Sequence, residues 1–465
     1  MNNETIQDRK SAGDLLREVM NTCANCDVCR LLMDESCLFF PELYRLVDRE
    51  EEEGIPTTEK ELLQMAQLCT LCGLCACPDI RIKIYTAKAA RVRENGMSFG
   101  ISLLADVERV GRWCSRFPGL ANAAMKLPCA STAAKRAARI ARERHLPRLP
   151  PEDFFSWARR KGLNRLPARE PKAAYFAGCT AGYLFPEVAE ATVAVLEHNG
   201  IAVHVSARQC CGMPTLVEGD KSLTLRRTAK NLEVLLDAAE AGCDPVCSCP
   251  TCGFFMKVLL REGAYYSEAY QKSVHAKDNE ILVPKTVAGA KQHFSLQKSV
   301  YGKILHDNPY FSTIDPLARM NLSEKIRDMG EYLYNLYEQG RLNTDMKPVN
   351  GQVAYFAPCH QREQGIGSPY EHLLGMIPDL HIRRVGGDLD CCGMGGSLGF
   401  KQDFHKASVR LAEPLIKKIK DASPEALITD CLSCRLQFRQ LLPALPVLHP
   451  LEILLKAYTG LKVRG

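Results

Sequence analysis

Long apolar runs are missing from this sequence of 465 residues. No stretch approaches the roughly 18 apolar residues of a membrane-spanning helix, and the first residues, MNNETIQDRK, lack the apolar core of a secretory signal. We therefore expect a cytoplasmic protein. A chain of this length exceeds the size at which one hydrophobic core keeps growing, so we expect about two to four domains.

Motifs for nucleotides and nucleic acids are also scarce. GMGGSLG (393–399) has the glycines of a dinucleotide loop, but it follows a cysteine pair and no acidic residue is placed to hold a ribose. We interpret it as a loop at a metal cluster. Because no other glycine fingerprint supports a flavin site, oxidation of an organic hydride donor must take place on a partner. No aromatic stacking platform or groove-reading motif favours nucleic acid.

Cysteine, in contrast, is abundant, with 22 residues. The cysteines cluster as C-x-x-C units in a large chain without an export signal, which favours metal in a reducing compartment. Residues 1–95 hold eight of them among the helix-like segments PELYRLVDREEEEG and TTEKELLQMAQL, where Thr57 or Thr58 is a candidate helix cap. These eight are Cys23, Cys26, Cys29, Cys37, Cys69, Cys72, Cys75 and Cys77.

The spacing of the eight cysteines is typical of a two-cluster ferredoxin. Three thiolates at two-residue intervals wrap one iron–sulfur cube, and the fourth cysteine serves the other cluster. The gaps before the fourth cysteines are seven residues and one, against the usual three. The pattern therefore supports the assignment of Cys37 and Cys77 less directly than that of the other six cysteines. Zinc and reduced core cysteines are the alternatives. We predict two [4Fe-4S] clusters, one on Cys23, Cys26, Cys29 and Cys77, the other on Cys69, Cys72, Cys75 and Cys37.

The rest of the chain contains one unit twice. KAAYFAGCT (172–180) matches QVAYFAPCH (352–360), RQCCGMP (208–214) matches LDCCGMG (389–395), and CPTC (249–252) matches CLSC (431–434). In the first copy, the strand-like segments AAYFAG, IAVHVSA and DPVCSC alternate with helix-like segments. We therefore predict an α/β fold with mainly parallel sheets, whose cysteines fall at strand ends, where ligands usually bind.

Details of this unit can be anticipated. One helix is expected to begin near Pro186 and to end before Gly200. The next helix places Leu225, Ala229, Leu232 and Leu236 on one face. The Tyr-rich connection over 263–350 is predicted to be mostly helical. The expected domains are 1–95, helical and ferredoxin-like; 96–172, a basic helical linker; 173–350, the first α/β unit with its connection; and 351–465, the second.

Each α/β copy supplies five cysteines, of which two are adjacent. Neighbouring side chains on a strand point to opposite faces, so both reach one cluster only if the backbone turns. Gly212 and Gly393 permit that turn, because glycine accepts positive φ and lets the backbone approach closely. We therefore take both glycines as part of the binding loops. The cysteines are Cys179, Cys210, Cys211, Cys249 and Cys252, then Cys359, Cys391, Cys392, Cys431 and Cys434.

The doubled pattern Cys…Cys-Cys-Gly…Cys-x-x-Cys behind a ferredoxin-like segment resembles the cysteine-rich CCG family of heterodisulfide reductases. With its ending CCGMGGSLGFKQDF…ITDCLSCRLQF…HPLEILL, nearly the whole chain is most similar to the iron–sulfur C subunits of anaerobic glycerol-3-phosphate dehydrogenases. The resemblance implies one or two noncubane [4Fe-4S] clusters in the CCG domains. It also implies electron transfer from a flavin-dependent dehydrogenase partner, for glycerol-3-phosphate or a similar donor, towards quinone. The alternative is a subunit that itself reduces a disulfide at a CCG cluster.

Other residues carry weaker signals. Cys114, Cys129, Cys243 and Cys247 are expected to be small buried hydrophobic residues. His360 and His449 are interpreted as packed or surface histidines, with cluster tuning as the alternative. Residues 91–172 hold 18 basic and 7 acidic residues. Because Leu103, Leu104, Trp113 and Phe117 lie among these arginines, we expect peripheral binding to the inner face of the cell membrane, with a linker that docks on an acidic partner as the alternative.

Overall fold

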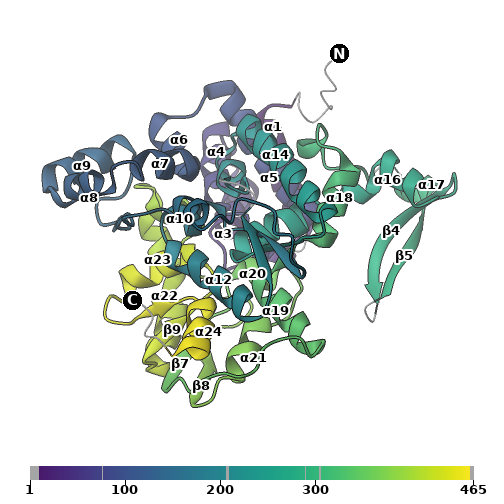
Figure 1. Ribbon diagram of the computed structural model, residues 1–465. Helices are drawn as coiled ribbons and strands as arrows, with labels where there is room; N and C mark the ends of the chain where they lie inside the picture. Colours follow the sequence, from purple (N-terminus) through teal and green to yellow (C-terminus); the bar gives the residue numbers. More distant parts are fainter. Residues whose placement is uncertain (1–9, 76, 206–208, 288–289, 303–304, 461–465) are drawn as a thin grey trace.

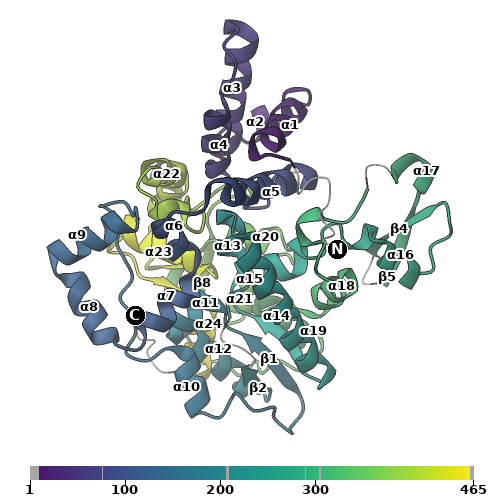
Figure 2. The same cartoon turned by 90° about the horizontal axis from the view of Figure 1, so that it is seen from above.

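The protein combines a helical N-terminal part with two parallel four-stranded sheets (Figure 1). The computed structural model describes residues 10–75, 77–205, 209–287, 290–302 and 305–460. In Figure 2 the N-terminal helices stand on one side of the molecule, while α8 and α9 lie at one flank and a hairpin lies at the other. The predicted combination of a helical N-terminal part with two parallel α/β sheets is confirmed.

The N-terminal helices hold the first cysteines in the loops between them. Both helix-like segments are helices, and Thr58 is the cap of the second, since its Oγ1 accepts a hydrogen bond from the N–H of Glu61 at 3.3 Å. Leu15, Leu43 and Met65 are fully buried in a core of their own. The elements are α1 (Ala12–Ala24), α2 (Val28–Leu32), α3 (Phe39–Glu53), α4 (Glu59–Leu68) and α5 (Pro78–Asn95).

The basic segment folds as short helices along one flank. Its middle projects from the body in both views, where α8 and α9 lie apart from the sheets (Figures 1 and 2). Pro118 and Pro128 start these two helices, in agreement with the preference for proline at a helix start. The elements are α6 (Phe99–Ala105), α7 (Val107–Cys114), α8 (Pro118–Lys126), α9 (Pro128–Ala137) and α10 (Phe154–Arg160).

The first parallel sheet has the strand order β2-β1-β3-β6. The three predicted strands and both predicted helices are present, with one helix starting at Pro186. Tyr175 in the central strand pairs with Val205 on one side and Val246 on the other. The elements are β1 (Lys172–Phe176), α11 (Gly178–Tyr183), α12 (Pro186–His198), β2 (Ala202–Val205), α13 (Met213–Glu218), α14 (Lys221–Glu240), β3 (Asp244–Cys247) and α15 (Pro250–Gly253).

The connection over 263–350 differs from the mostly helical prediction. It contains an antiparallel hairpin, in which Glu280 pairs with Gln297 at the open end and Val287 pairs with Ala290 next to the turn. It also contains the fourth strand of the first sheet. The β-branched residues Ile281, Val283 and Thr286 favour a strand there. The elements from Phe254 onward are η2 (Phe254–Leu259), η3 (Ala264–Tyr266), α16 (Glu268–Ser273), β4 (Glu280–Val287), β5 (Ala290–Gln297), α17 (Lys298–Tyr301), η4 (Pro309–Phe311), α18 (Pro316–Lys325), β6 (Arg327–Asp328) and α19 (Met329–Glu338).

The second sheet repeats the topology of the first. Its order, β10-β9-β7-β8, equals that of the first sheet when read from the opposite edge. In each copy the fourth strand leads into a helix closed by a capping box, from Asp328 in the first and His449 in the second. The elements are β7 (Gly351–Tyr355), α20 (Cys359–Arg362), α21 (Pro369–Gly375), β8 (Leu380–Arg384), η5 (Leu398–Phe400), α22 (His405–Ala422), β9 (Ala426–Ile428), α23 (Leu432–Leu441), β10 (Val447–Leu448) and α24 (Pro450–Thr459).

The buried face of α14 is more polar than predicted. Leu232 is buried, but Ala229 is exposed and Leu225 and Leu236 are only half-buried. Arg227 and Asn231 are buried instead. Both have partners that explain their burial, because Asn231 donates to the carbonyl of Cys210 at 3.0 Å and Arg227 forms ion pairs with Asp106 and Glu108 of the basic segment.

A buried ion pair of the second α/β copy lies against the first copy. Arg435 donates to Glu452 at 3.0 Å, and its guanidinium lies 5.0 Å above the ring of Phe185 in the first copy. Glu187, also in the first copy, is 3.7 Å away. Arg435 and Glu452 are 0% and 1% exposed, so neither charge has water as an alternative partner.

We expect Arg435→Met to lower the free energy of unfolding by about 3–5 kcal/mol, because it leaves the Glu452 carboxylate buried without its cation. Urea denaturation followed by far-UV circular dichroism measures this loss. The control is the double variant Arg435→Met/Glu452→Gln, which removes both charges and should recover most of the stability. A double variant as unstable as the single one would contradict the ion-pair explanation.

Candidate metal centres

The ten cysteines of the α/β copies follow the carboxyl ends of parallel strands. In each copy, one cysteine follows the first strand, the adjacent pair follows the second strand, and the C-x-x-C unit follows the third strand. The two copies face each other across a single cavity. The cysteines that line it are Cys179, Cys211, Cys249 and Cys252 from the first copy, and Cys359, Cys391, Cys392, Cys431 and Cys434 from the second.

The adjacent cysteines lie on tight turns. Gly212 has φ +110° and Gly393 has φ +76°, values that residues with a side chain rarely adopt. After the turn, the N–H of Met213 donates to Cys211 Sγ at 3.5 Å, and the N–H of Gly393 donates to Cys391 Sγ at 3.3 Å. The turns thus supply backbone donors to thiol sulfurs, as expected of ligand loops.

The thiols within each copy lie close enough to share protons. Cys210 Sγ is 3.4 Å from Cys179 Sγ, and Cys392 Sγ is 2.8 Å from Cys434 Sγ. A hydrogen bond from Cys179 lowers the pKa of Cys210, and a hydrogen bond from Cys391 lowers the pKa of Cys392. Because the thiolate is the metal-binding form, each copy holds a thiol predisposed to bind metal.

The N-terminal cysteines form an outer and an inner group. The outer loop (23–29) lies with Cys77, and Cys26 and Cys77 are exposed. Burial, together with the nearby Cys29 and Cys77, raises the pKa of Cys23 to about 12. The inner loop (69–75) lies with Cys37, whose pKa burial also raises to about 12, with a contribution from Cys69. These are the neighbours that the crossed assignment assumes, while ligation itself stays a prediction.

The inner group adjoins the second α/β copy. A small cavity lined by Cys37, Cys69, Cys72 and Cys75 also reaches Cys391. Cys72 in turn lines the cavity between the two copies. Cys75 of the inner group lies near enough to Cys23 to act on its pKa, so the outer group adjoins the inner group, which in turn adjoins the cavity shared by the two copies.

His360 connects three of these groups. Its Nε2 is 3.0 Å from the carbonyl of Leu71 in the inner loop, and its Nδ1 is 3.0 Å from Thr251 Oγ1 in the first copy. The ring stacks on Phe254 at 4.6 Å. Burial lowers the pKa of His360 to about 4, so the ring is neutral at pH 7. Because a carbonyl only accepts, Nε2 carries the proton and Nδ1 accepts from Thr251.

His449 fits the interpretation as a packed histidine. It is fully buried and accepts a hydrogen bond from the N–H of Leu451 at the start of α24. The four remaining cysteines divide. Cys243 and Cys247 are buried as expected, and Cys114 is half-buried, but Cys129 is exposed. The expectation was wrong for Cys129 because α9 projects from the body and offers it no core.

Two cationic side chains of α5 were missed from the sequence. The Nζ of Lys88 donates to the carbonyl of Cys69 at 2.6 Å, and Arg81 donates to the carbonyl of Gly73 at 3.3 Å. Burial lowers the pKa of Lys88 to about 8. The two residues are seven apart, or about two helical turns, and so share one face of a helix that begins at Cys77-Pro78. That spacing was a signal available in the sequence.

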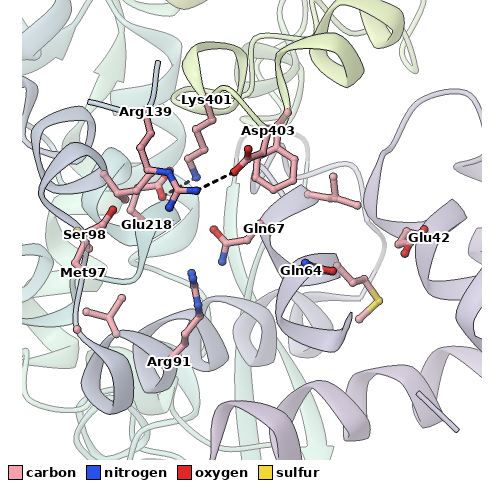
Figure 3. Close-up of a pocket in the computed structure, with 16 residues that line it drawn as sticks. Glu42, Gln64, Gln67, Arg91, Met97, Ser98, Arg139, Glu218, Lys401 and Asp403 are labelled. Carbon is pink, nitrogen blue, oxygen red and sulfur yellow. Dashed lines mark hydrogen bonds and ion pairs between the residues drawn. The ribbon is translucent and has the colours of Figure 1, made fainter. Parts of the chain in front are cut away.

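A polar pocket lies where the N-terminal helices meet the second copy (Figure 3). Lys401 and Glu218 form a buried ion pair at 2.7 Å, and Arg139 and Asp403 are 3.6 Å apart. Glu218 also accepts from Ser397, in the segment interpreted as a cluster loop. Since Glu218 belongs to α13 behind Cys211, these bonds link the two cysteine-pair loops. Among the described residues, no three His, Cys, Asp or Glu side chains are placed so that they could hold a single metal ion.

Comparison with known proteins matches residues 173–257 and 353–439 to the cysteine-rich domain called CCG. Relatives include the C subunit of the anaerobic glycerol-3-phosphate dehydrogenase of Escherichia coli K12, 23% identical over 76% of each chain. The B subunit of the fumarate reductase (CoM/CoB) of Methanothermobacter marburgensis is 24% identical over 61% of this chain and 46% of its own. The D subunit of the dihydromethanophenazine:CoB–CoM heterodisulfide reductase of Methanosarcina barkeri is 22% identical over 56% of this chain and 52% of its own.

The two paired-cysteine turns should respond differently to an added methyl group. A Cβ at Gly393 would lie 2.0 Å from the carbonyl oxygen of Ser408, whereas one at Gly212 would meet side chains alone, the Phe255 ring at 3.3 Å and Thr224 Cγ2 at 3.6 Å. Both variants incur the strain of positive φ, about 1–3 kcal/mol, and Gly393→Ala adds a backbone clash. We expect Gly393→Ala to lose more stability in urea denaturation than Gly212→Ala. Equal losses would contradict the tighter turn in the second copy.

Proposed function

We propose that this CCG cysteine-rich domain protein is the iron–sulfur electron-transfer subunit of an oxidoreductase complex, relaying electrons from a flavin-dependent dehydrogenase, for glycerol-3-phosphate or a similar donor, towards the quinone pool. The observation that carries the proposal is the sequential arrangement of the four cysteine groups from the exposed outer loop to the buried cavity. The relatives in glycerol-3-phosphate dehydrogenase and fumarate reductase support a role as one subunit among several.

The donor sets fit iron–sulfur clusters. Each N-terminal group offers four thiols and each α/β copy five, on loops with backbone N–H donors aimed at sulfur. When bound, such clusters accept and release single electrons at potentials set by burial and hydrogen bonding. The chain's own contribution is to hold the thiolates in fixed places and to exclude water. The outer and inner groups would hold cubane clusters, and one or both α/β copies would hold noncubane clusters.

The outer loop is the natural contact for the electron donor. Cys26 and Cys77 are exposed, whereas most of the cysteines in the two α/β copies are buried. A flavin on a partner protein therefore approaches this end of the series most closely. The absence of a second glycine fingerprint in the sequence agrees with a flavin on another chain.

A second function, disulfide reduction by this chain itself, is favoured by the shared cavity. Cysteines of both copies line it together with the apolar side chains of Met213, Val217 and Met394. A disulfide bound there would contact both groups at once. The relative in heterodisulfide reductase supports this alternative.

The projecting helices supply a surface for the membrane. Trp113 is 71% exposed and Phe117 69% exposed, and Leu120 and Leu127 on α8 and its end are also exposed. Leu103 and Leu104 are half-buried and contribute less. None of the described helices is both long and apolar enough to span a membrane. We propose that the basic segment 96–172, called the arm from here on, binds anionic lipid through its basic residues, each of which adds about 1 kcal/mol near the surface.

The anaerobically purified protein should be brown and contain about sixteen iron atoms per chain, four in each of four clusters. Cys391→Ser and Cys392→Ser should each degrade the signal of the second CCG centre in electron paramagnetic resonance while leaving the ferredoxin-type signals. Zinc as the dominant metal, or iron for one cluster only, would refute the proposal. Unchanged CCG spectra in both variants would refute ligation by the pair.

The protein should float with anionic liposomes at low salt, and Trp113→Glu/Phe117→Glu should abolish flotation. The control is Phe294→Glu/Val300→Glu, which changes two exposed apolar residues of the hairpin region on the opposite flank (57% and 59% exposed). Flotation that persists in the first variant, or that requires a separate membrane protein, would make the arm a docking linker and assign the quinone contact to another chain.

A further inference from the structure

Three donors from different parts of the chain hold the inner loop. The carbonyls of Cys69, Leu71 and Gly73 accept hydrogen bonds at alternate positions of one short segment. Their donors are Lys88 and Arg81 from α5 and His360 from the second α/β copy. The loop is therefore fixed from two sides at every second residue.

The donors differ in charge. His360 carries its proton on Nε2 as a neutral ring, and Arg81 is paired with Glu262. Lys88 is 4% exposed, and within the described ranges it forms no ion pair and donates one hydrogen bond, to the carbonyl of Cys69. Lys88 thus places a buried positive charge against the inner loop, and the one carboxylate that acts on it, Glu218, is itself paired with Lys401. Arg81 and His360 position the backbone.

The outer loop has no such donor among the described residues. The one side-chain contact to its ligand backbone in that part of the chain is the long bond of 3.4 Å from the Tyr44 hydroxyl to the carbonyl of Cys23. Arg30, which directly follows the outer loop, is paired with Asp27 and Asp48 at the surface. Water and these carboxylates screen its charge.

Reduction adds one negative charge to a cluster. A buried positive charge in a low-dielectric site stabilises that added charge much more strongly than a screened surface cation does. Hydrogen bonding and burial around the sulfurs are among the factors that set cluster potentials. The two N-terminal sites therefore differ in the property that sets the direction of electron flow.

We infer that Lys88 raises the reduction potential of the cluster at the inner loop above that of the cluster at the outer loop, with Arg81 and His360 as positioning residues. This inference rests on the proposed function, because it requires both clusters. With both clusters bound, electrons would run downhill from the exposed outer site to the inner site. Cys72, which lines the cavity between the copies, would hold the inner cluster next to both of them.

The test is a redox titration of the whole chain followed by electron paramagnetic resonance. Lys88→Met keeps the length and apolar stem of the side chain but removes the charge. At a fixed potential it should lower the ratio of reduced to oxidised inner cluster about tenfold, or about 59 mV for a one-electron couple. Lys88→Arg should restore most of the shift. The outer signal should stay in place in both variants.

The matched control is Arg91→Met, which removes one cation from the same helix. Arg91 points into the pocket of Figure 3 and has no hydrogen bond to a ligand loop within the described part of the chain. An equal shift in Arg91→Met, or no shift in Lys88→Met, would overturn the inference. If Lys88→Met does not fold, the wild-type titration decides, with the signals assigned through Cys26→Ser and Cys72→Ser. An inner midpoint at or below the outer one would overturn the inference, whereas loss of both signals in the wild type would overturn the proposed function instead.

Discussion

The rest of the structure depends on one constraint, which is that many thiol side chains must be held at fixed positions without bonding to one another. Parallel sheets meet this constraint because the carboxyl ends of their strands lie at one edge. In each copy that edge presents five cysteines, and the turns at Gly212 and Gly393 let two adjacent cysteines take part. The repeated topology then places the two edges against one cavity.

Fixed positions also require that segments distant in sequence stay together, and buried charges serve this purpose. Glu218 with Lys401 links the loops behind the two cysteine pairs, and Arg435 with Glu452 lies where the copies pack together. Such pairs contribute little net stability compared with apolar packing, but removal of one partner is costly, so they favour one arrangement over alternatives. The ion pair of Arg81 with Glu262 acts in the same way, because it holds α5, the helix that follows the inner loop, against the first copy.

Local features of this fold could be predicted from the sequence. The strand at 172–176, the helix that starts at Pro186 and the cap at Thr58 follow from periodicity, proline placement and capping chemistry. The hairpin at 280–297 was missed, and so was β6, a two-residue strand that owes its existence to its pairing with β3. The contact of His360 with Leu71 joins segments 289 residues apart, and no local pattern encodes a partner at that separation. The cysteine spacing predicted the groups, whereas their order through the molecule required the fold.

In the proposed relay, these cysteine groups pass electrons onward and do not themselves consume them. The most direct measurement takes the purified, cluster-loaded chain under anaerobic conditions, first with reduced viologen and a panel of common disulfides, then with its reduced flavin partner. The relay account predicts no disulfide turnover in the first experiment and reduction of the chain's clusters in the second. Fast and specific reduction of one disulfide by the isolated chain would contradict it.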